Sequence, residues 1–137
     1  LPVSPFQPQD IEALIELDRA AFPWLWQNEP SDFLAYTAPS NVAAFVARQG
    51  SRFLGYVSYS VVKTRGHLDR LAVHPRFTKK GYGSALLGTA LKRMQDCGVQ
   101  EVGLTTQQQN HSAQELYQVY GFARTGEVHE IYGLKLS

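Results

Sequence analysis

The chain has 137 residues, of which 44% are apolar, and its formal charge is +1. This length predicts a single domain over residues 1–137, and the near balance of charge argues against a broad nucleic-acid interface but not against one small anionic ligand. No apolar run reaches the roughly 20 residues that span a bilayer. The first residues lack the order of a signal peptide, and one cysteine, Cys97, excludes an internal disulfide. We therefore expect a cytoplasmic protein without a membrane or nucleic-acid partner, and leave a homodimer open.

The N-terminal third predicts one strand and two helices. Residues 3–7 can form a short strand, and Pro8 then opens a helix that ends before Pro23. A second short helix is expected over residues 31–38, with Ser31 as its N-cap. The first helix has an apolar face at helical spacing, made of Ile11, Leu14, Ile15 and Leu17.

The middle of the chain predicts three strands in succession. Residues 41–48 and 52–63 read as a hairpin, because both runs are rich in apolar and aromatic residues and Gly50 lies between them. A turn is expected at residues 64–66, followed by a strand over residues 67–73.

The pattern then changes to a helical period. Residues 83–97 predict a helix, residues 99–105 a strand, residues 110–120 a helix, and residues 122–128 and 131–136 two closing strands. The resulting order is β-α-α-β-β-β-α-β-α-β-β. It predicts an α/β (mixed α+β) fold with one twisted, mostly antiparallel sheet of about seven strands and helices on both faces.

The segment around residues 71–87 has the features of an anion site. Gly81 and Gly83 open the helix, whose first turn presents unpaired N–H groups and the positive end of the helix dipole. Ser84 can add a hydroxyl, and Lys79 and Lys80 supply positive charge. A simpler interpretation is a glycine turn before a helix.

Two other phosphate motifs fail on the same residues. A P-loop needs a lysine directly after its second glycine, but Thr89 follows Gly88. The dinucleotide fingerprint needs a small residue three positions after Gly83, where Leu86 stands. A nucleotide-binding module is therefore disfavoured.

Two longer motifs settle the interpretation of the glycine loop. The run Leu71-Ala-Val-His-Pro, then five residues, then Gly81-Tyr-Gly-Ser-Ala-Leu-Leu87 resembles the pyrophosphate-binding motif of the GNAT superfamily of N-acetyltransferases. Asn110-His-Ser-Ala-Gln-Glu-Leu-Tyr117, followed by Gly121-Phe122, is similar to that superfamily's second motif. The short run Ala21-Phe-Pro-Trp24 also resembles the branch that acetylates protein N-termini, such as ribosomal-protein alanine acetyltransferases.

The resemblance implies acetyl-CoA as co-substrate, no metal, and direct attack by a small-molecule or peptide amine. It also implies that the main chain near Leu71 and Val73 binds the pantetheine arm, with Asn110 as a second contact or only a helix cap. Thr78 stands where the family has Arg or Gln, so Lys79 and Lys80 are the compensating charges. The cofactor-binding loop expected from the resemblance consists of Thr78, Lys79, Lys80, Gly81, Tyr82, Gly83 and Ser84.

Three roles at the reacting centre come from the resemblance or from the residue types. Tyr117 is the candidate acid for the thiolate, with a core aromatic as the alternative. His67 is the candidate base, because imidazole titrates near neutrality; a surface histidine, or Asp69 on the same strand face, are the alternatives. Trp24, Trp26 and Tyr36 either line the acceptor pocket or fill the core. An acyl-CoA sensor of the same fold, without turnover, is the alternative function.

Overall fold

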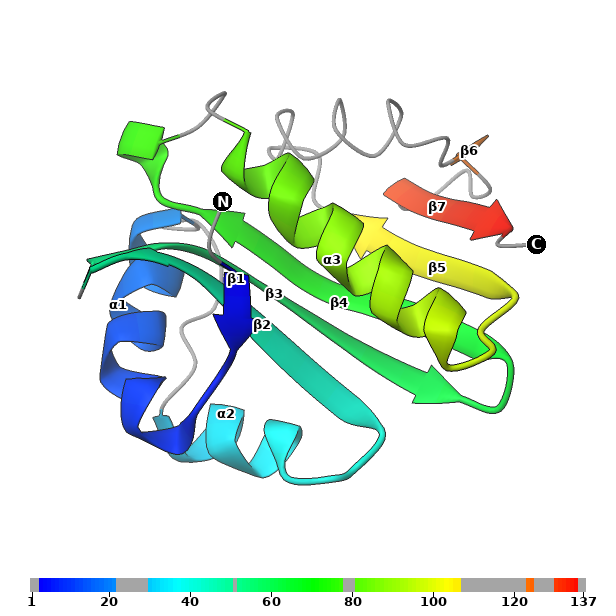
Figure 1. Cartoon of the computed structure of the whole chain (residues 1–137), viewed down its shortest axis with the longest axis horizontal. Helices are drawn as coiled ribbons and strands as arrows, with labels where there is room; N and C mark the ends of the chain where they lie inside the picture. Colours follow the sequence, from blue (N-terminus) through cyan, green and yellow to red (C-terminus); the bar gives the residue numbers. More distant parts are fainter. Residues whose placement is uncertain are drawn as a thin grey trace.

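The computed structural model describes residues 3–21, 30–50, 52–77, 81–106, 123–124 and 130–135. Within them one sheet runs in the order β1-β2-β3-β4-β5-β7-β6 (Figure 1). Only the β4–β5 pair is parallel among these described strands, so the mostly antiparallel mixed sheet is confirmed. The strand bounds are β1 Val3–Pro5, β2 Val42–Gln49, β3 Arg52–Val62, β4 Arg65–Val73, β5 Glu101–Thr106, β6 Ala123–Arg124 and β7 Glu130–Lys135.

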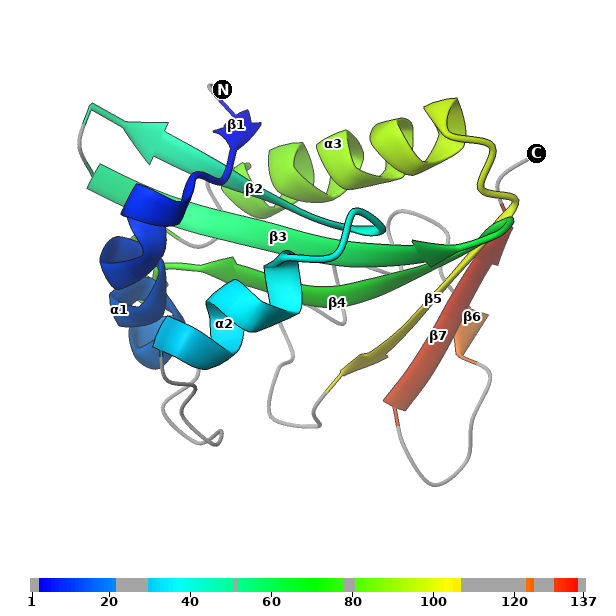
Figure 2. The same ribbon diagram turned by 90° about the horizontal axis from the view of Figure 1, so that it is seen from below.

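Helices cover both faces of the sheet, as predicted. Helices α1 (Ile11–Ala21) and α2 (Pro30–Thr37) lie on one face, and α3 (Tyr82–Asp96) lies on the other (Figure 2). None of the helices in the described ranges is long and apolar enough to cross a membrane.

Each face carries its own apolar cluster. The α3 cluster contains the predicted periodic residues of that helix, all buried: Leu86, Leu87, Ala90, Leu91 and Met94. The α1 cluster contains Leu14, Ile15 and Leu17, which pack against Val46 of β2 and Tyr56 of β3. Burial of this apolar surface is the main force that fixes the helices on the sheet.

Several local predictions differ from the structure. Helix α2 begins at Pro30, so Ser31 lies within it and is not its N-cap. Pro8 opens a 3-10 turn over Pro8–Asp10, and the α-helix begins at Ile11. The expected turn at residues 64–66 is wrong, because Arg65 and Gly66 already belong to β4. Gly66 serves packing, since a Cβ there would meet the Met94 Sδ of α3 at 2.5 Å. The expected helix over residues 110–120 lies outside the described residues.

Candidate active site

The site begins where β4 and β5 separate. Their parallel pairing runs from Arg65↔Glu101 to Leu68↔Leu104. Beyond Leu68 the two strands diverge, and β4 continues to Val73 beside β3 (Figure 2). The edge of β4 opposite β3 is therefore not paired with β5 beyond Leu68.

The main-chain groups of Leu71 and Val73 face that open edge. The His74 N–H donates to the Leu54 carbonyl of β3 at 2.8 Å. Hydrogen-bonded and non-hydrogen-bonded pairs alternate along an antiparallel ladder, so Ala72 also bonds to β3 while Leu71 and Val73 point the other way. The Leu71 side chain is buried in the α3 cluster. Its side chain is therefore part of the core, and the role that the resemblance implies for Leu71 concerns its main chain only.

Helix α3 begins near this edge with a left-handed residue. Gly81 is the N-cap, with φ 88°, and its carbonyl accepts the Ala85 N–H at 3.0 Å. Among the described residues, no atom beyond its chain neighbours lies within 4 Å of the position a Cβ would take, so the backbone conformation rather than crowding requires glycine. Tyr82 packs edge-on against Phe77, with ring centroids 6.2 Å apart. Tyr82 and Gly83 follow in the first turn of α3, and the N–H groups of a first helical turn point out of the N-terminal end of the helix.

An irregularity in β4 determines which of its side chains lie on the face of the sheet covered by α1 and α2. Tyr59 pairs with Leu68 and Ser58 pairs with Arg70, so Asp69 is an extra residue in β4. In such a bulge the side-chain alternation is broken. Leu68 stays with the α3 cluster, whereas Asp69 and Arg70 both face α1 and α2.

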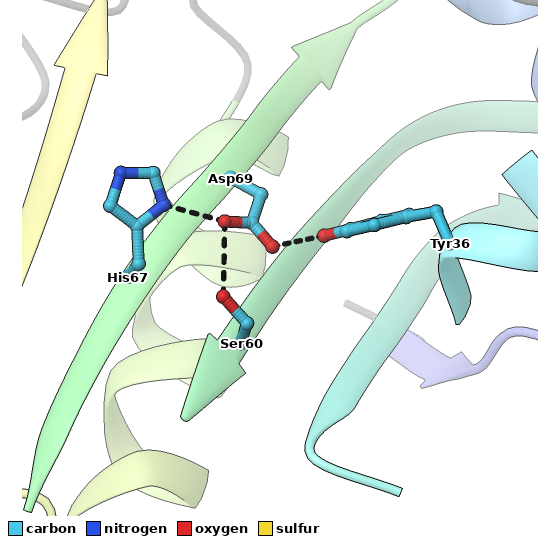
Figure 3. Close-up of polar contacts among 4 residues, drawn as sticks. All are labelled: Tyr36, Ser60, His67 and Asp69. Atoms are coloured by element: carbon cyan, nitrogen blue, oxygen red, sulfur yellow. Dashed lines mark hydrogen bonds and ion pairs between the residues drawn. The ribbon is translucent and has the colours of Figure 1, made fainter. Parts of the chain in front are cut away.

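Asp69 is the centre of a polar cluster (Figure 3). Its Oδ1 lies 2.5 Å from His67 Nδ1 and accepts the Ser60 hydroxyl of β3 at 3.2 Å. Its Oδ2 accepts the Tyr36 hydroxyl of α2. The His67 side chain is 51% exposed and that of Asp69 is 20% exposed. The two candidate bases of the sequence are therefore one linked pair, with the imidazole on the solvent side.

Contacts within this cluster raise the pKa values of His67 and Tyr36. The hydrogen bond to Asp69 raises the pKa of His67, partial burial opposes this, and the Asp69 charge adds to the rise. Burial raises the pKa of Tyr36 well above its ordinary value, and the bond to Asp69 adds to this. Tyr36 is therefore a neutral hydroxyl that donates to Asp69, and the pKa of His67 lies above its ordinary value.

A second polar cluster fixes α1 beside the first. Arg70 Nη1 donates to Asp18 Oδ1 and Oδ2 at 3.0 and 2.9 Å, and the buried Tyr56 hydroxyl donates to Oδ1 at 2.7 Å. Burial and the Asp18 charge raise the pKa of Tyr56. Adjacent β4 residues thus hold different helices, with Asp69 bonded to α2 and Arg70 bonded to α1.

Sequence reasoning missed several members of these clusters. Ser60 carried no signal in the sequence, and Tyr36 was considered only as a pocket or core aromatic. Asp18 could have been found, because it extends the buried face of α1 next to Leu17. A carboxylate on such a face predicts a charged partner.

The structure describes some of the other residues considered in the sequence analysis and leaves the rest outside its described ranges. His74 Nδ1 accepts the Arg76 N–H at 3.2 Å. Among the residues the structure describes, no group of three His, Cys, Asp or Glu side chains could hold a metal ion. The predicted residues that lie outside the described ranges are Thr78, Lys79, Lys80, Asn110, Tyr117, Trp24 and Trp26.

Comparison with known proteins identifies the family of the chain. The model of the acetyltransferase (GNAT) family matches residues 11–122. The ribosomal protein bS18-alanine N-acetyltransferase of Haemophilus ducreyi is 31% identical over 122 residues, which cover 83% of this chain and 77% of that protein. The chain therefore belongs to the acetyltransferase (GNAT) family.

Two solved structures share the fold. The ribosomal-protein-S18-alanine N-acetyltransferase of Escherichia coli superposes with a TM-score of 0.86 at 21% identity, covering 99% of this chain and 94% of that one. The PaiA N-acetyltransferase of Thermoplasma acidophilum, in complex with coenzyme A, superposes with a TM-score of 0.79 at 22% identity, covering 99% and 100%.

Proposed function

We propose that this N-acetyltransferase, acting as one domain over residues 1–137, moves the acetyl group of acetyl-CoA to the α-amino group of a protein or peptide N-terminus. The observation that carries the proposal is the His67–Asp69 pair on β4, next to the point where β4 leaves β5. This arrangement offers a base beside an open strand edge. Transfer is direct from thioester to amine, without an acyl-enzyme.

The residues present fit acetyl-CoA. The pantetheine arm has amide groups that can pair with the outward main chain of Leu71 and Val73. The diphosphate is an anion, and it suits the first turn of α3 after the left-handed Gly81. From the family resemblance, the loop residues Thr78, Lys79 and Lys80 complete this contact, and Asn110 meets the pantetheine. When bound, the co-substrate supplies an acetyl group activated as a thioester.

His67 removes a proton from the acceptor. An α-amine is mostly an ammonium ion near neutral pH, and only the free base can attack a carbonyl carbon. Neutral His67 takes one N–H proton and passes it to solvent. The amine nitrogen then bonds to the acetyl carbon as the C–S bond breaks, and the bond's electron pair leaves on sulfur.

Two further groups assist at the thioester. An N–H of β4 near Leu71 polarises the carbonyl oxygen. The second proton lost by the amine nitrogen balances the proton gained by sulfur, and the resemblance assigns delivery of that proton to the Tyr117 hydroxyl. The products are an acetylated amine, a thiol and one proton released to solvent.

The choice of acceptor rests on relatives. The H. ducreyi protein is named for the alanine of a ribosomal protein, and so is the E. coli structure. Both names describe acetylation of an alanine in a protein. A peptide N-terminus is therefore the substrate class to test first, ahead of lysines, polyamines and aminoglycosides.

The test is thiol release from acetyl-CoA with a matched set of acceptors. One peptide has a free N-terminal alanine and no lysine, a second has a blocked N-terminus and one lysine, and a third has both ends blocked and no lysine. Spermidine and an aminoglycoside complete the set. We expect release only with the free N-terminus. Equal or faster release with the blocked lysine peptide or the small amines would overturn the N-terminal assignment.

A further inference from the structure

The carboxylate of Asp69 accepts hydrogen bonds from three neighbouring side chains. Oδ1 accepts from Ser60 and His67, and Oδ2 accepts from Tyr36. These donors come from β3, β4 and α2, so three separate elements converge on one side chain (Figure 3). Each of its oxygens already accepts a hydrogen bond, which leaves the more exposed His67 as the partner that can meet an amine.

The contact with Asp69 selects one form of the neutral imidazole. A carboxylate accepts but does not donate, so His67 must carry its proton on Nδ1 to bond to it. The lone pair then resides on Nε2, and that nitrogen points away from Asp69 (Figure 3). Gly103 of β5 is the register partner of His67 and adds no side chain beside the ring.

We infer that Asp69 is a positioning residue, which holds His67 in the tautomer and orientation that take the proton of the amine, and that Ser60 and Tyr36 fix Asp69 in turn. This inference rests on the proposed function, because it needs His67 to be the base. The inference has a second consequence. Because Tyr36 belongs to α2, the position of Asp69, and through it that of His67, depends on where α2 lies.

Among the residues that the structure describes, few charged side chains lie near His67. On its own strand, His67 contacts Asp69. Arg65 lies two residues before His67 and therefore on the same face of β4. Arg65 is itself paired with Glu101 of β5 at 3.3 Å, and both of these side chains are well exposed. Ser60 of β3 is uncharged, Tyr36 of α2 is neutral, and Arg70 is paired with Asp18 of α1. Asp69 is therefore the group expected to govern the titration of His67.

The first experiment measures the imidazole directly. The pKa of His67 is followed by NMR in ¹⁵N-histidine-labelled protein, with the signal assigned by its loss in His67→Gln. Asp69→Asn removes the carboxylate charge while keeping the side-chain shape, so the pKa of His67 should fall. Asp96→Asn makes the same change on α3, on the opposite face, and should leave it unchanged. An unaltered His67 titration in folded Asp69→Asn protein would overturn the inference.

The second experiment asks whether Asp69 acts through His67. Asp69→Asn should lower kcat/KM for the acceptor by about tenfold or more and shift the acidic limb of its pH profile to lower pH. In a His67→Ala background the same change should alter the rate by less than about twofold, because the residue it positions is gone. An equal loss in both backgrounds would show that Asp69 acts independently of His67.

A third experiment tests the Tyr36 and Ser60 hydroxyls, which donate to Asp69, with matched control variants. Tyr36→Phe and Ser60→Ala should each change the pKa of His67 in the same NMR titration, because each removes a hydrogen bond to the Asp69 carboxylate, and Ser60→Thr, which keeps a hydroxyl, should restore it. Tyr59→Phe removes a phenol from the α3 face of β3 and should have no effect. If Tyr36→Phe and Ser60→Ala both behave as Tyr59→Phe does, they do not support Asp69. The NMR titrations need no acceptor substrate. They therefore test the role of Asp69 even if a peptide N-terminus is not the substrate.

Discussion

His67 Nδ1 lies 2.5 Å from Asp69 Oδ1, and this contact joins two residues that the sequence offered as rival bases. Both sit on the same face of β4, because residues two apart in a strand point the same way. The bulge at Asp69 then turns Arg70 to that face as well. One short stretch of β4 therefore carries the imidazole, its carboxylate support and the anchors of both α1 and α2.

Gly81 should matter for the co-substrate and not for the acceptor. Its φ of 88° is a conformation that costs a residue with a Cβ about 1–2 kcal/mol. Gly81→Val should therefore distort the first turn of α3 and raise the KM for acetyl-CoA by about tenfold or more, with little change in the KM for the acceptor. Gly83→Asp should act in the same direction by repelling the diphosphate.

The control for Gly81 lies at the other end of the same helix. Gly98 has the same φ of 88° and the same open surroundings. Gly98→Val should introduce similar strain and leave the KM for acetyl-CoA unchanged. Equal values in the Gly81→Val and Gly98→Val enzymes would remove the assignment of the diphosphate site to the start of α3.

Asp18 should be important for stability. Asp18→Ala leaves Arg70, 28% exposed, without its carboxylate and deprives the buried Tyr56 hydroxyl of its acceptor. Loss of one partner from a buried pair costs about 3 kcal/mol or more. Chemical denaturation should show this loss. Asp96→Ala breaks an exposed pair with Lys92 and should cost less than about 1 kcal/mol. Similar costs for the two variants would contradict a supporting role for the Asp18 cluster.

Tyr117→Phe should keep acetyl-CoA binding and slow turnover. The variant preserves the ring and loses one O–H that could protonate the departing sulfur. A thiolate is a tolerable leaving group, since thiols have a pKa near ~8.5, so we expect a loss of about 10- to 10³-fold in kcat. Calorimetry with coenzyme A and thiol-release kinetics measure the two properties separately. Turnover within about twofold of wild type at saturating substrates would leave Tyr117 as a packing residue only.

The sequence predicted those parts of the molecule that depend on local patterns. The spacing of Leu86, Leu87, Ala90, Leu91 and Met94 defined α3 and its buried face, and Gly81 marked its start. Strand periodicity also predicted that His67 and Asp69 lie on the same face of β4. These features could be predicted because each is set within one element.

The remaining features depend on contacts between distant segments. Tyr36 and Asp69 are 33 residues apart, and Asp18 and Arg70 are 52 apart, so neither pairing can be predicted from a helical or strand period. The bulge at Asp69 depends on how β4 aligns with β3. Gly66 looked like a turn residue because its real constraint, contact with Met94, comes from a helix far along the chain.

The most direct test of the account is the pH dependence of kcat/KM for the acceptor in wild type and His67→Ala. Because the bond to Asp69 raises the pKa of His67, the acidic limb of the wild-type profile should have its midpoint above ~6.5, and activity should fall as His67 becomes protonated below it. His67→Ala should remove that limb and lower the rate at neutral pH by about 10²- to 10⁴-fold. A variant profile that coincides with the wild-type profile would contradict the assignment of His67 as the base.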